Sequence, residues 1–479
     1  MSATCPLSVE IPYEDPAILF KAFSDQPWAF LLDSADANRP LDDTNRFSYI
    51  AFDPFETIVI KDGARIGTTE MIHNPFQYVR DLVQQYQLAY QPHLPLLQGG
   101  AIGYFSYDLC HYLEDINRPQ QKEETAFADL ALGLFDLLIS FDHVLQKAWI
   151  ISCGFPEKTP AAQWARAKLR LAACLERLSA IGHDQPLHAT ECEKIDLISS
   201  CDQEAYAARV RKAQAYIREG DIFEVNLSHR FQAMIQDKPV DPYTLYLSMR
   251  HTNPSPFSAY LNLDDHHILS TSPERFLSLT DQQVSTRPIK GTAPRGKTPE
   301  EDQAIADALL SSEKDRSENV MIVDLLRNDL SKVCTASSVT VKKLCGLESY
   351  PTVHHLVSVI EGTLQQGFTA FDLLAACFPG GSVTGAPKIR AMQIIYELEP
   401  TERGPYCGSI GFVGFNGVMD TSIVIRTLLY QNNMLSYQAG GAIVLDSCPE
   451  GEYEETLVKS RAIKRALASW CQNRRNSMQ

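Results

Sequence analysis

Short runs that are apolar throughout, or that alternate apolar with polar residues, dominate the first third of the chain. Such runs predict strands where turn residues bound them, whereas a period of 3.6 residues predicts a helix. The strand-like runs are 28–34, 47–52, 57–61, 99–107, 130–139 and 147–153, and the helical ones are 75–86 and 161–181. Residues 182–194 are polar and without periodicity, so we place a boundary there between regions 1–190 and 195–472.

Helices alternate with strands in the second region. Helices are predicted at 202–218, 312–328, 370–377, 387–398 and 452–470, and Thr298 followed by Pro-Glu-Glu predicts another helix start with a capping box. Strands are predicted at 222–232, 258–263, 268–270, 276–279, 408–415 and 421–429, and in the apolar run around His354 and His355. The pattern therefore predicts a mixed α/β fold in which helices cover large sheets.

Composition narrows the function classes. The chain has 43 basic and 59 acidic residues among 479, a net charge of −16, and no basic patch that suits nucleic acid or an anionic membrane. No run of about 18 apolar residues and no apolar leader pattern occurs, so we expect a cytoplasmic protein without a membrane anchor. The twelve cysteines include no Cys-x-x-Cys pair, which argues against zinc or iron–sulfur ligation and favours free thiols.

One lysine and two pairs of acids are the first candidates for chemistry. Lys290 follows a predicted hairpin and precedes a glycine, where it either faces a cleft or is an ordinary solvated lysine. Two acid pairs have the spacing i and i+3: Asp315 with Glu318, and Glu452 with Glu455. That spacing places both members of a pair on one helix face. Four carboxylates from two helices suit Mg²⁺, although two solvated helix faces have the same pattern.

Other residues point to a bound anion. Arg426 lies in an otherwise apolar run, and a partly buried arginine needs an anionic partner such as a carboxylate. The glycine pair at 440–441 either lets the backbone approach a ligand or serves packing. The glycine-rich run 378–392 is not a nucleotide-binding P-loop, but amides at the helix start within it would suit a carboxylate. His354 and His355 cannot both face inward, so we expect one to be exposed and the other polar-bonded or catalytic.

Several motifs together resemble the chorismate-utilising enzymes. They are DRSENVMIVDLLRNDL from 315, ESYPTVHHLVSVIEGTL from 348, FPGGSVTGAPKIRAM from 378, GPYCGSIGFV from 404, VIRTL from 424 and DSCPEGEYEETLVKS from 446. The resemblance covers the second region almost continuously, and the first region resembles the N-terminal part of members that aminate chorismate. It implies large, mainly antiparallel sheets packed face to face, and chorismate as the substrate.

Position 290 separates two branches of this family. The branch that makes anthranilate has alanine in Pro-Ile-Ala-Gly-Thr, whereas the branch that makes 4-amino-4-deoxychorismate, for 4-aminobenzoate and folate synthesis, has lysine, as here. Chorismate accepts a nucleophile at C2 with loss of its C4 hydroxyl, so ammonia at C2 leads to anthranilate. If the Lys290 amine attacks C2 first, ammonia must add at C4 and expel the lysine.

The attack by Lys290 requires a neutral amine, which predicts a lowered pKa for this lysine. Two alternatives to this activity remain: the anthranilate-forming branch, and a non-catalytic member that only binds a ligand or metal. Because the sequence contains no Gly-x-Cys-x-Gly glutaminase nucleophile, ammonia is expected from a glutamine amidotransferase partner.

The resemblance also implies roles for single residues. Glu274 corresponds to the general acid that protonates the departing hydroxyl, with a salt bridge to Arg275 or Arg287 as the alternative. His355 corresponds to the family's active-site histidine. Seven positions correspond to substrate-binding residues: Thr292, Thr384, Tyr406, Arg426, Gly440, Gly441 and Lys459.

The two acid pairs correspond to the Mg²⁺ site of the family. Glu318 and Glu455 match direct ligands, whereas Asp315 and Glu452 match ligands that act through water. Lys459 also fits a simple i,i+4 salt bridge to Glu455.

Two features of the chain fall outside this comparison of active-site motifs. Glu224 stands where the amine-transferring relatives usually have glutamine and the water-adding relatives have lysine; the absence of that lysine counts against a water-adding activity. Eight residues resemble the family's tryptophan pocket, or else simply pack the core: Ser34, Thr44, Asn45, Arg46, Phe47, Pro256, Phe257 and Ser258.

Overall fold

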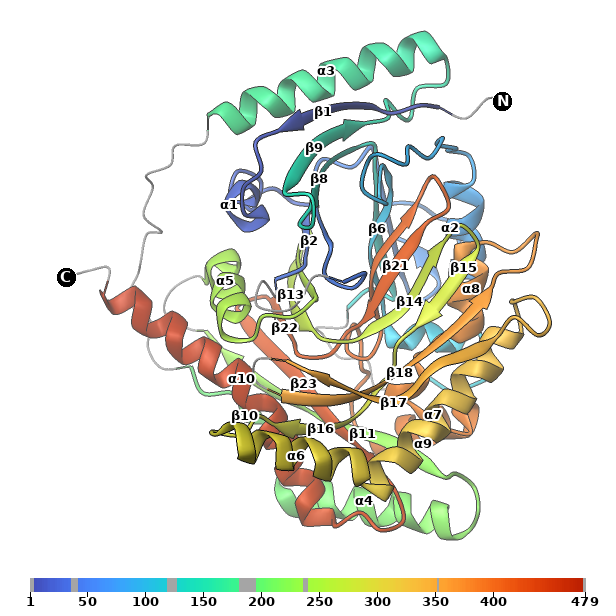
Figure 1. Ribbon diagram of the computed structural model, residues 1–479, viewed down its shortest axis with the longest axis vertical. Coiled ribbons are helices and arrows are strands. Elements are labelled where there is room, and N and C mark those ends of the chain that lie inside the picture. Colours follow the sequence, from blue (N-terminus) through green and yellow to red (C-terminus); the bar gives the residue numbers. More distant parts are fainter. Residues whose placement is uncertain are drawn as a thin grey trace.

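Two large sheets packed face to face form the centre of the molecule, and helices cover their outer faces (Figure 1). The computed structural model describes residues 4–35, 42–118, 127–180, 195–235, 240–350 and 353–476. Neighbouring strands run antiparallel in both sheets. This architecture confirms the predicted fold class.

The first sheet contains twelve strands. In spatial order they are β1 (Leu7–Ile11), β9 (Lys147–Ser152), β8 (Leu137–Asp142), β3 (Phe47–Ala51), β2 (Ala29–Asp33), β12 (Phe257–Asn262), β13 (His266–Ser272), β22 (Thr427–Gln431), β23 (Met434–Ile443), β11 (Glu224–Met234) and β10 (Ile198–Ser199), with β19 (Gly385–Ala386) also paired to β11.

The second sheet contains eleven strands. Their order is β16 (Ile289–Pro294), β18 (Val353–Thr363), β15 (Gln283–Thr286), β14 (Arg275–Thr280), β21 (Met419–Ile423), β20 (Ser409–Gly414), β6 (Gly100–Phe105), β7 (Leu130–Phe135), β4 (Glu56–Lys61) and β5 (Ala64–Arg65), with β17 (Thr340–Ser349) paired to β18.

Ten α-helices and two short 3₁₀ helices occur in the described ranges. They are α1 (Pro16–Phe20), α2 (Pro75–Val83), α3 (Pro160–Ser179), α4 (Gln203–Arg218), α5 (Pro242–Thr252), α6 (Pro299–Ser311), α7 (Glu313–Ser331), α8 (Ala370–Cys377), α9 (Lys388–Leu398), α10 (Pro449–Asn476), η1 (Tyr107–Tyr112) and η2 (Gly381–Val383). Within these ranges, none of the helices has the length and apolarity to cross a bilayer.

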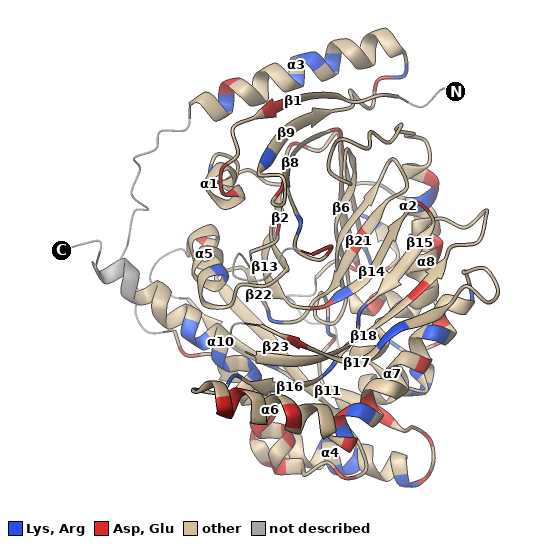
Figure 2. Cartoon of the chain, in the orientation of Figure 1, with Lys and Arg blue, Asp and Glu red and all other residues tan. Residues whose placement is uncertain are grey.

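Three large apolar clusters follow from this layering. Phe30 and Tyr49 of the first sheet pack against Ile102 and Phe412 of the second, between the sheets. The other two clusters lie under the helices that cover the outer faces. Figure 2 shows that charged residues are frequent on helices such as α4, α6, α7 and α10, whereas the strands carry few. The helices therefore present their polar faces to solvent and their apolar faces to the sheets.

Regions 1–190 and 195–472 do not form separate sheets. In the first sheet β2 pairs with β12, and in the second β6 pairs with β20, so each sheet joins strands of both regions. The linking segment 182–194 lies outside the described residues. The two regions are therefore interleaved parts of one sandwich.

Two predicted strands prove to be pairs of strands that change sheets. The run 130–139 divides at Asp136 into β7 and β8, which belong to different sheets. The run 421–429 likewise divides into β21 and β22, and Arg426 lies in the crossing with a positive φ of 52°. The predicted capping box is also incomplete, because the Glu301 carboxylate accepts from the amide of Lys297 rather than that of Thr298.

Candidate active site

Lys290 lies on β16 with only 9% of its side chain exposed. Its Nζ donates to Glu224 Oε1 at 2.6 Å, and Glu224 is the first residue of β11 in the opposite sheet. The short strand β19 can approach β11 because residue 385 is glycine: a Cβ there would lie 2.2 Å from the Glu224 carbonyl oxygen. Lys290 is therefore a buried, ion-paired lysine at the junction of the two sheets, and the solvated alternative is excluded.

The expectation of a lowered pKa for Lys290 is wrong for the chain on its own. Burial lowers the pKa of the amine, but the carboxylates of Glu224, Glu318 and Glu274 together raise it further than burial lowers it. Lys290 is consequently held in its protonated form before any ligand enters.

Glu274 lies in the turn between β13 and β14 and is almost completely buried. Burial raises the pKa of its carboxyl to about 7, and its Oε1 accepts a hydrogen bond of 2.7 Å from Ser382 Oγ. The two arginines proposed as salt-bridge partners bind elsewhere: Arg275 pairs with Asp43 and Asp420, and Arg287 with Asp43 and Glu348. Glu274 thus has the environment of a carboxylic acid that keeps its proton near neutral pH.

The first acid pair projects from α7 toward β16. Ser312 caps this helix and donates to Asp315 Oδ2, and a Cβ on Gly291 would lie 3.0 Å from the Asp315 Cβ. Burial raises the pKa of Glu318 to about 7, while Lys290 and Lys314 act to lower it. The pair therefore lies directly beside the residue that follows Lys290.

The second acid pair projects from the first turns of α10 toward β23. A Cβ on Gly441 would lie 3.1 Å from Glu452 Oε2 and 3.6 Å from Glu455 Oε1. Burial raises the pKa of Glu455, but Lys459, Lys314 and Lys290 lower it more, so that it lies below its ordinary value. Lys290 and Lys314 thus act on acids from both helices, which shows that the pairs are directed at one region.

These acids fit a cation that takes few protein ligands. Within the described ranges, no group of three His, Cys, Asp or Glu is close enough to form a complete metal site. Glu318 Oε1 and Glu452 Oε2 are nevertheless buried without a hydrogen bond from any described residue. Buried carboxylate oxygens left in this state suit Mg²⁺, which binds through one or two carboxylates and keeps several waters.

The glycine pair and Lys459 serve both structure and site. A Cβ on Gly440 would lie 2.3 Å from the Leu227 carbonyl oxygen, so packing against β11 requires this glycine. Gly441 faces the acids of α10 instead. Lys459 Nζ lies 2.7 Å from Glu455 Oε1 and donates to the Gly440 carbonyl oxygen at 2.8 Å. The i,i+4 salt bridge therefore exists, and it also fixes the lysine at the strand.

Arg426 is half-buried between β21 and β22. Its guanidinium makes no hydrogen bond or ion pair with any residue in the described ranges, and burial lowers its pKa. Arg426 is therefore suited to bind an anionic ligand, because its guanidinium is desolvated and lacks a partner among the described residues, and its backbone is held in a left-handed conformation.

Both histidines of β18 are buried, so the expectation that one is exposed is wrong. His355 Nδ1 lies 2.7 Å from Thr292 Oγ1 on β16. His354, on the opposite face, lies 2.8 Å from Ser349 Oγ and 3.0 Å from Asp302 Oδ1, because α6 covers that face. The structure thus joins His355 to Thr292 and gives His354 a structural role.

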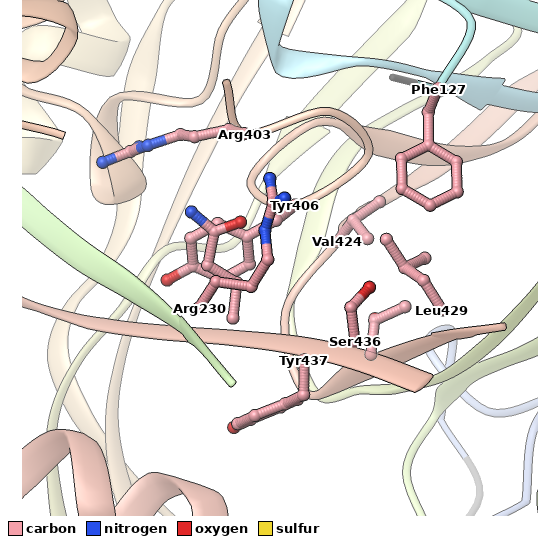
Figure 3. A pocket seen from close by; sticks show the side chains of 10 residues that line it. Phe127, Arg230, Arg403, Tyr406, Val424, Leu429, Ser436 and Tyr437 are labelled. Atoms are coloured by element: carbon pink, nitrogen blue, oxygen red, sulfur yellow. The ribbon is translucent and has the colours of Figure 1, made fainter. Parts of the chain in front are cut away.

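Thr384 and Tyr406 lie on the side of the site near β11. Thr384 Oγ1 donates to the Gly380 carbonyl oxygen at 2.8 Å and accepts from Tyr107 at 3.3 Å. Tyr406 lines a small cavity between the sheets, on the Ser436 side of β23 (Figure 3). The Arg403 guanidinium, which also lines it, lies 5.8 Å from the Tyr406 ring centroid. Tyr406 therefore belongs to a neighbouring cavity, while Thr384 lies beside the strand that carries Glu224.

Two residues at the site were not predicted from sequence. Ser382 donates to Glu274, and Asn319 donates to the carbonyl oxygens of Lys290 at 3.4 Å and Leu356 at 3.2 Å. Asn319 is fully buried on the helix that carries Glu318, so it fixes the backbone of β16 relative to α7. The sequence offered one signal for Asn319, because an asparagine on the apolar face of the helix predicted at 312–328 needs a buried polar partner.

A second cavity lies between the sheets at β2, β12, β20 and β21. Six of the eight residues predicted for tryptophan line it: Ser34, Thr44, Phe47, Pro256, Phe257 and Ser258. Asn45 and Arg46 do not, because Asn45 accepts from the Asp42 amide and Arg46 pairs with Asp142. The predicted residues thus converge on a real pocket.

The sandwich, with an acid-lined site around a buried lysine and the unpaired guanidinium of Arg426 among the described residues, suits an enzyme with a small anionic substrate. The family profile described as chorismate binding enzyme matches residues 29–465, and the chain belongs to this family.

Relatives from two branches of the family align over nearly the whole chain. Aminodeoxychorismate synthase component 1 of Salmonella typhimurium is 39% identical over 98% of this chain and 99% of its own length. Anthranilate synthase component 1 of Pseudomonas putida is 35% identical over 97% and 95%. The crystal structure of anthranilate synthase component I from Streptococcus pneumoniae superposes with a TM-score of 0.77 at 34% identity, covering 89% of this chain and 94% of that one.

Proposed function

We propose that this chorismate-utilising enzyme aminates chorismate at C4 to give 4-amino-4-deoxychorismate, a precursor for 4-aminobenzoate and folate synthesis. The observation that supports this activity is the buried Lys290 amine, which lies among Glu224, Glu274 and Glu318 and faces the acids of both helices. A lysine there competes with ammonia for C2 and so directs ammonia to C4. The similarity to the Salmonella typhimurium protein over nearly the whole chain agrees with this assignment.

Each residue at the site has a separate role in the reaction. The Lys290 amine adds to C2, and Glu274 gives its proton to the departing C4 hydroxyl, which leaves as water. Arg426 receives a substrate carboxylate, and Thr292 with His355 completes the wall beside the lysine. Ammonia then adds at C4 while the bond from C2 to the lysine breaks.

Mg²⁺ would be held by Glu318 and Glu455 directly and by Asp315 and Glu452 through water, and would supply positive charge for the substrate's ring carboxylate. Because the relatives are named component 1, we propose a second component, a glutamine amidotransferase, as the source of ammonia. We also propose that the pocket lined by Ser34, Phe47 and Pro256 holds tryptophan.

The anthranilate-forming activity is the second candidate, because relatives of that kind align almost as well. The protein is incubated with chorismate, Mg²⁺ and ammonium, and half of each sample is treated with a lyase that converts 4-amino-4-deoxychorismate to 4-aminobenzoate. We expect 4-aminobenzoate only after the lyase. Fluorescent anthranilate without the lyase would assign the other branch, and unconsumed chorismate would indicate a binding protein.

A further inference from the structure

The pair formed by Lys290 and Glu224 holds a proton between two buried groups. The 2.6 Å contact is the only hydrogen bond that the Lys290 amine makes with described residues. Glu224 is fully buried, and its other oxygen, Oε2, has no hydrogen bond from any residue in the described ranges. A buried carboxylate with one unsatisfied oxygen is a poorly stabilised anion. Transfer of a proton from the Lys290 amine to the Glu224 carboxylate would remove both buried charges.

The other charged groups that face Lys290 are less suited to take its proton. Glu318 acts on it from α7, Glu455 from α10 and Glu274 from the turn between β13 and β14, and none of the three is hydrogen-bonded to the amine. Glu274 accepts from Ser382 and must keep its own proton for the leaving hydroxyl. Glu224 is therefore the group positioned to accept the proton from the Lys290 amine.

We propose that Glu224 is the base that deprotonates Lys290 before it attacks chorismate, and that the same carboxyl returns the proton when the lysine leaves. This inference rests on the proposed function. Glutamine at this position could hold the amine by a hydrogen bond but could not accept its proton.

The protons balance over the cycle. Glu224 takes one proton from the Lys290 ammonium, and the neutral amine forms the bond to C2 while the ring double bond shifts and the C4–O bond breaks. Glu274 supplies the proton that turns the departing hydroxyl into water. Ammonia then bonds to C4, the C2–N bond breaks, and Lys290 leaves as a neutral amine. Glu224 returns its proton to Lys290, and the new C4 ammonium reprotonates Glu274.

The test measures adduct formation in the full chain with chorismate and Mg²⁺ and without ammonia, by rapid quench and intact-protein mass spectrometry. Wild type is expected to gain the mass of chorismate minus water. Glu224→Gln keeps the shape of the side chain, and we expect it to form the adduct about 10²-fold more slowly near pH 7. Its rate should rise about tenfold per pH unit under alkaline conditions, because hydroxide then takes the proton. Glu361→Gln is the control: this carboxylate is 42% exposed, pairs with Lys342 alone among the described residues, and its change to an amide should match wild type.

An equal or faster rate in Glu224→Gln would overturn the inference, because Glu224 would then only hold the proton on the lysine. Glu224→Asp, which keeps a carboxylate, should recover part of the rate, and it decides the question if the glutamine variant does not fold. A wild-type enzyme that aminates chorismate at C4 without any adduct would instead refute the covalent route of the proposed function. The two failures are therefore distinguishable.

Discussion

Two sites in the same sandwich differ in how their charged side chains are paired. At the pocket between β2, β12, β20 and β21 the charged side chains are paired within the protein: Arg275 binds Asp43 and Asp420, and Asp33 accepts from Arg250. Around Lys290, Arg426 has no partner among the described residues, and carboxylate oxygens of three glutamates lack hydrogen bonds from them.

The paired charges stabilise the fold, whereas the unpaired charges are available for binding and catalysis. A matched charge contributes to the fold and leaves little to gain when a ligand arrives, whereas an unmatched buried charge costs free energy until a ligand supplies its partner. A substitution at the lysine site should therefore change the rate, whereas a ligand in the pocket should leave the rate nearly unchanged and stabilise the fold only through its own binding.

Loss of Lys290 should have the largest effect. Lys290→Ala should reduce 4-amino-4-deoxychorismate formation by more than about 10³-fold. It should also lower the free energy of unfolding by about 3–5 kcal/mol, because Glu224 is left buried and unpaired. The double variant Lys290→Ala/Glu224→Gln removes that charge, so urea unfolding should show recovered stability while the product assay shows no recovered activity. Full product formation by Lys290→Ala would disprove the lysine route.

Glu274→Gln should reduce kcat by about 10²–10⁴-fold, because the amide cannot protonate the leaving hydroxyl. The wild-type kcat should fall as pH rises through about 7, the pKa of this buried carboxyl, since the acid form is the active one. A pH–rate profile with ammonia concentration held constant checks both statements. An activity that stays level up to pH 9 would show that Glu274 is not the acid.

The same carboxyl should make stability depend on pH. Its raised pKa means that its contribution is fully present below pH 4.5 and is lost as pH rises through about 7. Between these limits wild type should lose about 3 kcal/mol that Glu274→Gln does not lose. Urea unfolding at pH 5 and pH 8 measures the difference, with Glu361→Gln as the matched control at an exposed site. Parallel curves for wild type and Glu274→Gln would contradict the assigned pKa.

Arg426→Lys should raise the KM for chorismate by about tenfold to a hundredfold, because a point charge replaces a two-pronged carboxylate contact worth about 1.5–3 kcal/mol. The kcat should change much less. Steady-state kinetics separates the two, and an unchanged thermal midpoint shows that the backbone at φ 52° is intact. A fall in kcat at constant KM would place Arg426 in the chemical step instead.

Tryptophan binding should have the smallest effect on the reaction. At a concentration about 100-fold above its Kd, tryptophan should stabilise the protein by about 2.7 kcal/mol. Ser34→Leu fills part of the pocket and removes the hydroxyl that donates to the Phe47 carbonyl oxygen at 2.7 Å, so it should abolish this effect. Equilibrium dialysis with labelled tryptophan measures binding directly, and its absence in wild type would rule out this ligand.

Local patterns predicted most elements of the fold because periodicity reports burial on one or both faces. They missed the divisions at Asp136 and Arg426, since a strand that leaves one buried sheet and enters another remains apolar throughout. The need of Arg426 for an anion was predictable from its apolar neighbours. Its place in a crossing between sheets was not.

Contacts between distant segments explain the rest of the differences at the site. The i and i+3 spacing predicted which acids share a helix face, but not that Glu224 would reach Lys290 from the other sheet. That contact depends on how the two sheets are placed, which no local pattern contains. The carboxylates that raise the pKa of Lys290 in the chain alone also depend on this placement, and neither histidine of β18 is exposed because α6 covers the face of His354.

The interleaving of the two regions has a consequence for synthesis of the chain. When the ribosome has released the first region, the edges of β2 and β6 that pair with β12 and β20 remain unpaired, because these two strands are synthesised much later. Sheet edges left open in this way can pair with other chains. A fragment that ends after α3 should therefore aggregate or remain sensitive to protease by itself, and the nascent protein should depend on chaperones until its last strands emerge.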